Sequence, residues 1–392
     1  MKTHLFASLA ITAALCSPAA NAQERRPVRI GILETFSGPF GMIGQAITNA
    51  FMLELDANGG RLGGVPVRIV RQDDQAKPDV GLQAAIQMVE QDKIDVMLGP
   101  TMTNVILAAY QPVVQARTVM ISTVGGPGEL AGKFCNPYFF STSWQNSDTA
   151  ASMGQHMQDI GIKNLFIEAP NFEGGREVVA GVKRYYKGNV VKELFTPMTQ
   201  QDFSAELTQI RLAAPQAVFA FYPGNLAVNF IKQYSQAGLL EKFPLFTASS
   251  IDGTNLAAMG DAPMQTYQTA SWNADLPNPA NQAFVAAYRA KYHDTPSFYA
   301  AYAYDAALLL DSALRQTGGA DDRPALVKAM EKADFASVRG GFKFGPNHFP
   351  LQDFYLLQVA KSPAGAVEQQ VRGTVFSMHG DDYVNQCHMP AH

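Results

Sequence analysis

The chain has little excess charge of either sign, because 30 basic residues stand against 34 acidic ones for a net charge of −4. So small and mixed a charge provides no basic field, which excludes nucleic acid and an acidic membrane surface as partners. Long apolar runs are also missing after the first 22 residues, and the run at residues 5–15 is too short to span a bilayer. We therefore expect no membrane-spanning segment.

The short apolar run at the N-terminus has the form of a secretory leader. Lys2 precedes it, and the string ANA follows as a small-x-small cleavage site before Gln23. We predict that residues 1–22 are a cleaved signal peptide and that the mature protein is periplasmic. A lipid anchor on Cys16 is disfavoured, because Leu15 stands where lipidation signals have a small residue.

Cysteine is scarce as well, with three in the chain, of which Cys135 and Cys387 lie beyond the leader. In an oxidising compartment two such thiols favour a disulfide over two free cysteines. The bridge would pin the C-terminal tail to the end of the first half of the fold.

Motifs of common enzymes are absent or misplaced. The sequence has no G-x-S-x-G and no H-E-x-x-H, and its seven histidines lie in no recognisable catalytic setting. The string GGRLGG follows a helix and precedes a strand, the reverse of a dinucleotide site, and in GPGELAGKF Pro127 replaces the first glycine of a phosphate loop. We expect no catalytic residue, no cofactor and no metal site.

Apolar strands alternate with amphipathic helices in two series, which predicts an α/β fold with parallel sheets. The first series starts at Val28 with a strand, a loop (SGPFGMIG), a helix and a second strand, and a further series starts near Ser147. A Pro- and Asn-rich break at residues 266–282 is followed by helices at 280–292, 298–316 and 323–332 and by the late strands GFKF and FYLLQVA. This order suggests two lobes that exchange segments.

Several strings together carry a family likeness. They are SGPFGMIG, LDANGGRLGGVPV, DDQAKPDVGLQAA, VMLGPTMTNVILAAYQPVV, MISTVGGPGEL, QDFSAEL, FYPGNLAVNFIKQYSQAGL and PSFYAAYAYDA. The chain resembles the periplasmic solute-binding proteins of ABC importers, in the branched-chain amino-acid (Leu/Ile/Val-binding-like, type I) family. The strings span nearly all of the mature sequence. The sequence of the second lobe is most similar to family members that take up aromatic or other organic carboxylates.

The resemblance implies a fold of two Rossmann-like lobes joined by three hinge strands, which close over a ligand like a trap. Lobe 1 would contain residues 28–143 and 273–350, and lobe 2 would contain residues 144–272 and 351–385. The chain would cross between the lobes near residues 141–145, 269–273 and 350–353. Closure of this kind needs only contacts that the ligand makes with both lobes.

In an open parallel sheet a ligand lies beyond the carboxyl ends of the strands. The candidate ligand-binding residues at these ends are Phe36, Ile43, Met102, Thr103, Thr123, Val124, Phe172, Tyr222, Asp252 and Trp272. Thr103 begins a helix, where free backbone N–H groups attract an anion, and in the family this position gives a hydroxyl to the ligand carboxylate. A plain helix cap is the alternative role of Thr103.

Other family positions bear on the ligand class. Val124 matches the position whose carbonyl takes the amino group of amino-acid ligands, but Gly126 replaces a threonine that helps to bind their carboxylate. Asp252 lies near the acidic residue that pairs with a ligand ammonium, although Ser250 is the ungapped match. Aromatic side chains crowd the same loops, where they could stack on a flat ring or merely pack the lobe edges.

These observations favour a solute-binding receptor, not an enzyme, that captures an aromatic or small organic carboxylate. The implied partners are that small molecule and the membrane permease of an ABC importer, and we expect a monomer. An aliphatic or branched-chain amino acid, or an amide, is the alternative ligand. A ligand-sensing module would share the fold, whereas a periplasmic hydrolase would need a nucleophile–base pair that the sequence does not offer.

Overall fold

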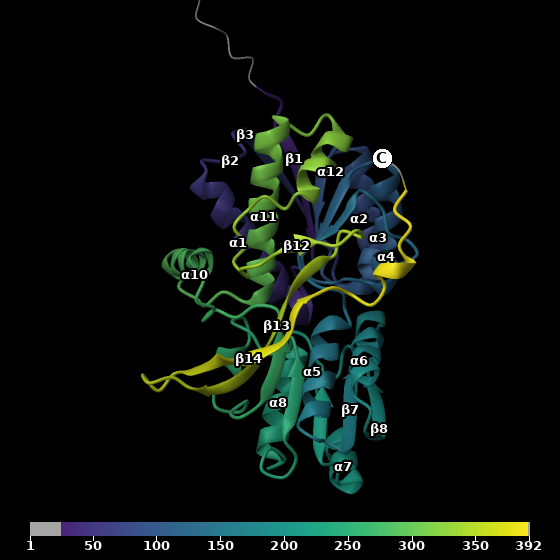
Figure 1. Ribbon diagram of the computed structural model, residues 1–392, viewed down its shortest axis with the longest axis vertical. Helices are drawn as coiled ribbons and strands as arrows, with labels where there is room; N and C mark the ends of the chain where they lie inside the picture. The colour runs from purple at the N-terminus through teal and green to yellow at the C-terminus, as the bar shows by residue number, and fades with distance from the viewer. Residues whose placement is uncertain (1–24, 391–392) are drawn as a thin grey trace, which may run out of the picture.

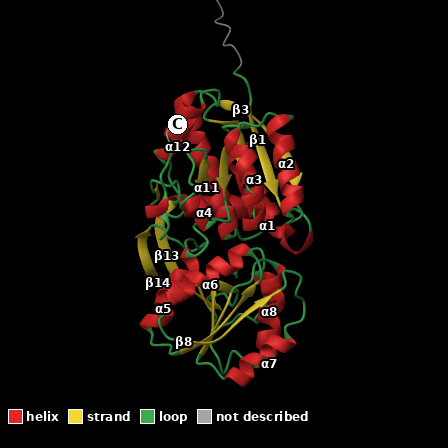
Figure 2. Ribbon diagram, turned by 90° about the vertical axis from the view of Figure 1, so that its right-hand side faces the viewer, coloured by secondary structure: helices red, strands yellow, loops and turns green. Residues whose placement is uncertain are grey.

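The computed structural model describes residues 25–390, so the predicted signal peptide at residues 1–22 lies outside it. The fold is α/β, with two halves stacked along the long axis of the molecule, each built on its own sheet (Figures 1 and 2). We use lobe 1 for the half with the six-stranded sheet and lobe 2 for the half with the eight-stranded sheet. The boundaries proposed from the sequence are kept except for residues 343–344, which they assign to lobe 1 but which pair with a strand of the other sheet.

The sheet of lobe 1 has the order β2-β3-β1-β4-β5-β6, and all its pairs are parallel except β2 with β3. Its strands are β1 (Val28–Glu34), β2 (Arg61–Leu62), β3 (Val65–Asp73), β4 (Val96–Leu98), β5 (Val119–Ser122) and β6 (Phe139–Ser141). Six of the seven residues of β1 are buried, as expected for a parallel strand that is covered on both faces.

Helices from both ends of the chain cover the sheet of lobe 1. They are η1 (Gly38–Phe40), α1 (Gly41–Ala57), α2 (Pro78–Glu90), α3 (Thr103–Gln115), α4 (Gly128–Ala131), α10 (Pro279–Tyr292), α11 (Phe298–Thr317) and α12 (Arg323–Glu331). Helix α11 packs along α1 and against α12, so the late helices return to lobe 1. The sequence placed these three late helices to within one residue.

The sheet of lobe 2 has the order β12-β13-β11-β10-β9-β7-β8, with β14 paired to β13. Its strands are β7 (Asn164–Pro170), β8 (Asn189–Thr196), β9 (Ala217–Ala220), β10 (Leu245–Ala248), β11 (Tyr267–Ala270), β12 (Lys343–Phe344), β13 (Pro350–Lys361) and β14 (Val367–His379). Its helices are α5 (Asp148–Asp159), α6 (Glu173–Tyr185), α7 (Ser204–Ala213), α8 (Asn225–Gln236), α9 (Leu256–Met259) and η2 (Val384–Gln386). Strands β13 and β14 form an antiparallel hairpin that projects from the molecule (Figure 1).

The chain passes between the sheets after β6, after β11 and between α12 and β12. We call residues 142–147, between β6 and α5, the first crossing segment. A fully buried ion pair joins Arg339 to Asp305 beside these crossings, with 2.9 Å between Nη2 and Oδ2. Arg339 also donates to the carbonyl of Ser143 at 3.2 Å and to Oε1 of Gln352 at 2.5 Å. One guanidinium therefore links the first crossing segment to the start of β13.

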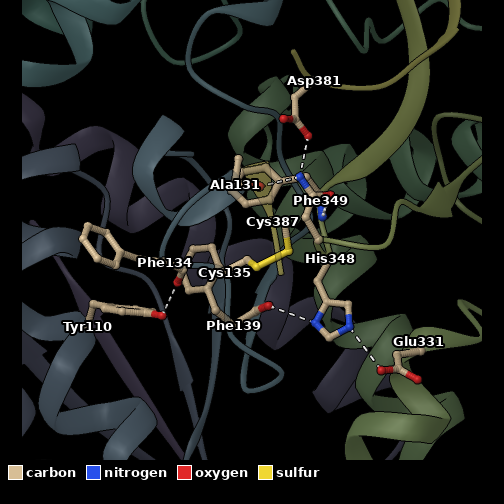
Figure 3. The surroundings of a disulfide bond; sticks show 11 residues. Tyr110, Ala131, Phe134, Cys135, Phe139, Glu331, His348, Phe349, Asp381 and Cys387 are labelled. Carbon is tan, nitrogen blue, oxygen red and sulfur yellow. Dashed lines mark hydrogen bonds and ion pairs between the residues drawn. A yellow bond between two sulfur atoms is a disulfide. The ribbon is translucent and has the colours of Figure 1, made fainter. Parts of the chain in front are cut away.

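The C-terminal tail leaves β14 and returns to lobe 1, where it runs past α4 (yellow in Figure 1). The expected disulfide is present and joins Cys135 to Cys387 (Figure 3). Beside it, the side chain of Asn347 donates to the carbonyl of Ala131 at 2.9 Å and to the carboxylate of Asp381 at 2.7 Å. We call residues 380–387 the C-terminal strap.

The strap is also attached to lobe 2. The carboxylate of Asp382 lies 2.5 Å from the guanidinium of Arg184, at the end of α6, and the same guanidinium faces the ring of Tyr383. The strap therefore spans both lobes, in addition to the three crossings. In the part of the chain that the structure describes, no helix is both long and apolar enough to cross a membrane.

Candidate functional site

A small cavity lies between the lobes, where loops at the carboxyl ends of both sheets meet. From lobe 1 and the first crossing segment its walls comprise Ile43, Thr101, Met102, Thr103, Val124, Gly125, Trp144, Asn146 and Tyr299. From lobe 2 they comprise Thr149, Phe172, Gly174, Val178, Phe221, Pro223 and Ser249. We call this the interlobe cavity.

Two helix N-termini from different lobes meet at this cavity. Helix α3 starts at Thr103 after Met102, helix α6 starts at Glu173 after Phe172, and neither N-terminus has a side-chain cap. Exposed N–H groups and the helix dipole give such ends a partial positive charge. The cavity is therefore suited to an anion of the size of a carboxylate.

Glycine in α6 allows the two helix ends to approach each other. A Cβ atom at Gly174 would lie 2.7 Å from the hydroxyl oxygen of Thr103 and 2.8 Å from the ring of Phe172. Real side chains do not tolerate such distances, so the close approach of lobe 2 to Thr103 requires glycine here.

The hydroxyl of Thr103 belongs to a buried hydrogen-bond network. Asn146 Nδ2 donates to Thr103 Oγ1 at 3.0 Å and also to a carboxylate oxygen of Glu177 in α6. The backbone N–H of Gly126 donates to Asn146 Oδ1 at 2.7 Å, and that of Gly128 donates to Glu177 Oε1 at 2.7 Å. The network therefore connects lobe 1, the first crossing segment and lobe 2.

Two carboxyl groups near the cavity, those of the buried Glu34 and the half-buried Glu177, are less acidic than usual. Burial raises the pKa of Glu177 to about 7, although the hydrogen bonds from Asn146 and Gly128 act in the opposite direction. Burial also raises the pKa of Glu34 well above its ordinary value, while the hydroxyl of Thr101 donates to its carboxylate and opposes the shift. Burial thus makes the neutral form of both groups more favourable than in water.

The remaining walls are aromatic and apolar. The Trp144 ring packs edge-on against Tyr302 and Phe298, with ring centroids 5.2 and 5.9 Å away, so its position is fixed. Phe172, Phe221 and Tyr299 add three more rings. Within the described chain, the residues that line this cavity include no lysine, arginine or histidine. A bound anion would have to be held by dipoles and not by an opposite charge.

Five of the candidate residues from the sequence lie together in the interlobe cavity: Ile43, Met102, Thr103, Val124 and Phe172. The carbonyl oxygen of Val124 accepts a hydrogen bond from the hydroxyl of Ser143 at 2.9 Å. A protein donor therefore already occupies one lone pair of the carbonyl that would take an amino group in amino-acid receptors.

The other five candidates do not line this cavity. Tyr222 is buried in lobe 2, where its hydroxyl donates to Glu168 Oε1 at 2.7 Å, and its neighbour Phe221 reaches the cavity instead. Asp252 and Trp272 line a separate opening of about 600 Å³ next to β14.

Phe36 and Thr123 also lie away from the interlobe cavity. The ring of Phe36 is covered by the guanidinium of Arg71, whose central carbon lies 4.4 Å from the ring centroid. Thr123 is buried, and its hydroxyl lowers the pKa of Glu34, against the larger effect of burial.

Sequence reasoning missed Trp144, Asn146, Phe221 and Ser249, all of which line the cavity. The first two belong to the first crossing segment, which the resemblance located without assigning a ligand contact to it. The Ser249 side chain is 2% exposed, and its hydroxyl has no hydrogen-bond partner among the described residues. A buried hydroxyl that faces a cavity without a partner is a candidate ligand contact.

Comparison with known proteins agrees with this architecture. A solute-binding protein of an ABC transporter from R. palustris, solved in complex with benzoate, is 30% identical, with a TM-score of 0.88 over 93% of this chain and 100% of that one. A second, from Rhodopseudomonas palustris BisB5 in complex with 3,4-dihydroxybenzoic acid, is 27% identical, with a TM-score of 0.86 over 91% of this chain and 99% of that one.

A curated relative supports the same assignment. The Leu/Ile/Val-binding protein homolog 6 of Brucella melitensis biotype 1 is 27% identical over 387 residues, which cover 95% of this chain and 98% of that protein. A family model described as periplasmic binding protein matches residues 27–365. Because that match covers well over half of the chain, we conclude that the chain belongs to the periplasmic binding protein family.

Proposed function

We propose that this protein captures an aromatic or small organic carboxylate outside the cytoplasm and delivers it to the membrane permease of an ABC importer. Proteins of its family and its structural neighbours are solute-binding receptors and not enzymes. The observation that carries the ligand class is the interlobe cavity, where two uncapped helix N-termini and the Thr103 hydroxyl face aromatic walls.

The polar end of the cavity supports a carboxylate. Each of the two helix ends offers backbone N–H donors, and a bound anion benefits from both dipoles. The hydroxyl of Thr103 lies at the same point, and this residue is 3% exposed, so a ligand that it contacts is shielded from water. Hydrogen bonds to a charged group in such a site contribute about 1.5–3 kcal/mol each.

The aromatic walls support a flat ring as the rest of the ligand. Trp144, Phe172, Phe221 and Tyr299 line the cavity together. Aromatic rings pack on one another edge to face or offset, so these side chains are suited to contact with a flat ring. The benzoate and 3,4-dihydroxybenzoic acid complexes of the two R. palustris relatives support the same ligand class.

The cavity is less suited to an α-amino acid, whose ammonium group needs a carboxylate or a free carbonyl. Asp252, the acidic candidate, lines a different opening. Glu177 is engaged by Asn146 and Gly128, and the Val124 carbonyl accepts from Ser143. An aliphatic amino acid therefore remains the second candidate, and the names of the Leu/Ile/Val-binding protein homologs of Brucella favour it.

Closure would follow from contacts that the ligand makes with both lobes. Helix α3 contacts α6 across the cavity, and η1 contacts α8. The backbone also meets closely there, because a Cβ atom at Gly224 in lobe 2 would lie 2.9 Å from the carbonyl oxygen of Pro39 in lobe 1. A ligand that contacts both lobes binds the closed state more tightly than the open state. It stabilises the closed state by this difference in binding free energy.

A thermal-shift screen of the purified protein tests the proposed ligand class. Each compound is added at about 1 mM, because a compound that binds only the folded state raises Tm. The compounds are benzoate, 4-hydroxybenzoate, 3-phenylpropionate, succinate, leucine and isoleucine. We expect the aromatic carboxylates to raise Tm and the two amino acids to leave it unchanged. A rise with leucine and isoleucine alone would overturn the proposal.

A further inference from the structure

We propose that Asn146 fixes the hydroxyl of Thr103 as a hydrogen-bond donor toward the ligand, so that the interlobe cavity selects a carboxylate. Glu177 holds Asn146 in this role from the other lobe. The inference rests on the proposed function, which it deepens by naming what sets the polarity of the site.

The orientation of the Asn146 amide follows from its neighbours. The backbone N–H of Gly126 lies 2.7 Å from Oδ1 and can only donate, so the carbonyl oxygen of the amide must face it. The amide nitrogen then faces the opposite side, where Thr103 and Glu177 lie. Both of its hydrogens have an acceptor in this arrangement.

The orientation of the amide determines the role of Thr103. An amide nitrogen cannot accept a hydrogen bond, so Thr103 Oγ1 must be the acceptor in the 3.0 Å contact with Asn146. The hydroxyl proton is then directed elsewhere, and no protein group in the described chain accepts it. Because Thr103 lines the interlobe cavity, its proton is available to a ligand.

A hydroxyl that is fixed as a donor distinguishes between ligands. A carboxylate oxygen accepts the proton in a charge-assisted hydrogen bond, whereas a ligand N–H group at the same place would leave the hydroxyl proton without an acceptor. The two helix N-termini beside Thr103 also present donors only. The two helix ends and the Thr103 hydroxyl therefore have the same preference.

Glu177 connects the relay to closure of the lobes. It belongs to α6 in lobe 2, yet it accepts from Gly128 N, in lobe 1, at 2.7 Å and from Asn146 in the first crossing segment. The acidic groups that act on it are Glu173 and Glu129. The contacts of Glu177 join the two lobes, so closure adds an acceptor that holds the Asn146 amide in the orientation set by Gly126.

A double-mutant cycle tests the relay. Calorimetry at pH 7.5 measures the Kd of benzoate, and of benzamide as a neutral probe, for the unsubstituted protein, Asn146→Ala, Thr103→Val and the double variant. We expect each single variant to bind benzoate at least tenfold more weakly. The double variant should match Thr103→Val within about twofold, because Asn146 acts through the hydroxyl that Thr103→Val has already removed.

Benzamide and a matched control separate the relay from a general loss of structure. The loss for benzamide should be at most threefold in each single variant, and Asn171→Ala, which changes an exposed asparagine before α6, should leave both affinities unchanged. Should Asn146→Ala not fold, Glu177→Gln provides the second test. It keeps the shape of the side chain but puts an NH₂ group opposite a donor, so it should weaken benzoate binding at least threefold.

Three results would overturn the relay: an unchanged benzoate Kd in Asn146→Ala, losses that simply multiply in the double variant, or equal losses for benzoate and benzamide. If the unsubstituted protein binds none of the aromatic carboxylates, the proposed function fails and the relay fails with it. Binding by the unsubstituted protein without coupling between Asn146 and Thr103 removes the relay alone.

Discussion

At the scale of single residues, the buried carboxyl group of Glu168 couples stability to pH. Burial raises its pKa to about 8, opposed by the hydrogen bond from Tyr222 and reinforced by the charge of Glu206. Its ordinary pKa is 4.5, so the folded state holds a proton that the unfolded chain releases first. Folding is therefore favoured by this group below pH 4.5, and the contribution is lost as pH rises through about 8.

We expect the free energy of unfolding to fall between pH 5 and pH 8.5, by about 2–5 kcal/mol from this group. Urea unfolding at the two pH values measures the change. Glu168→Gln cannot ionise and should flatten the dependence. An equally steep dependence in Glu168→Gln would show that other groups cause it, among them Asp252, whose pKa burial raises to about 6.

Gly174 offers a second prediction at this scale. Gly174→Ala would add a Cβ atom 2.7 Å from the Thr103 hydroxyl, so the lobes could no longer approach fully. We expect the affinity for benzoate to fall at least tenfold, as measured by calorimetry. Gly319→Ala is the matched control, because its Cβ would meet nothing within 4 Å, and equal affinities in the two variants would contradict the prediction.

Half of the ten candidate residues from the sequence line the interlobe cavity. The other half lie elsewhere for local reasons. Met102, Thr103 and Phe172 directly precede or begin a helix after a parallel strand, a position that the strand–helix pattern locates. Beyond the end of β9, however, one residue decides the direction of a side chain, and Phe221 faces the cavity while Tyr222 packs inside lobe 2. Periodicity does not resolve that choice once the strand has ended.

At the scale of elements, the hinge depends on one buried arginine. Arg339 binds Asp305, Ser143 and Gln352, and it is 3% exposed. Removing one partner of a buried ion pair leaves an uncompensated charge.

We expect Arg339→Met to lower the free energy of unfolding by about 3–5 kcal/mol, because Asp305 stays buried without its partner. Denaturant unfolding measures the change. Arg211→Met, at an exposed arginine that donates to the carbonyl of Ala237, should stay within about 0.5 kcal/mol of the unsubstituted protein. A loss no larger than that of the control would contradict a structural role for the hinge pair.

Most helices and buried strands followed from the sequence, whereas β14 did not. Its burial alternates irregularly and eight of its residues are polar or glycine, so no strand period stands out over Val367–His379. It exists because β13 offers an edge, and the two pair with bulges along their length. Pairing with a distant segment, and not local propensity, forms this strand.

At the scale of the whole molecule, the C-terminal strap joins the two lobes in addition to the three crossings. It is bonded covalently to lobe 1 through Cys135 and Cys387 and held to lobe 2 by the pair of Arg184 with Asp382. Because the strap is attached to both lobes, we expect it to restrict their opening more than the three crossings would alone.

We expect the double variant Cys135→Ser, Cys387→Ser to open more widely without ligand, because the covalent limit on the strap is gone. Small-angle X-ray scattering should give a larger radius of gyration for the ligand-free variant than for the unsubstituted protein. With saturating benzoate the two should coincide. An identical radius in the ligand-free proteins would mean that the strap does not restrain opening.

The absence of a cationic side chain among the cavity residues of the described chain has a consequence for the surroundings in which the receptor works. Dissolved ions weaken attraction between charges that water can reach, but they do not penetrate a closed apolar chamber. If helix dipoles inside that chamber hold the captured anion, its affinity should depend little on ionic strength. Capture of the solute would then proceed almost equally well over a wide range of salt concentrations.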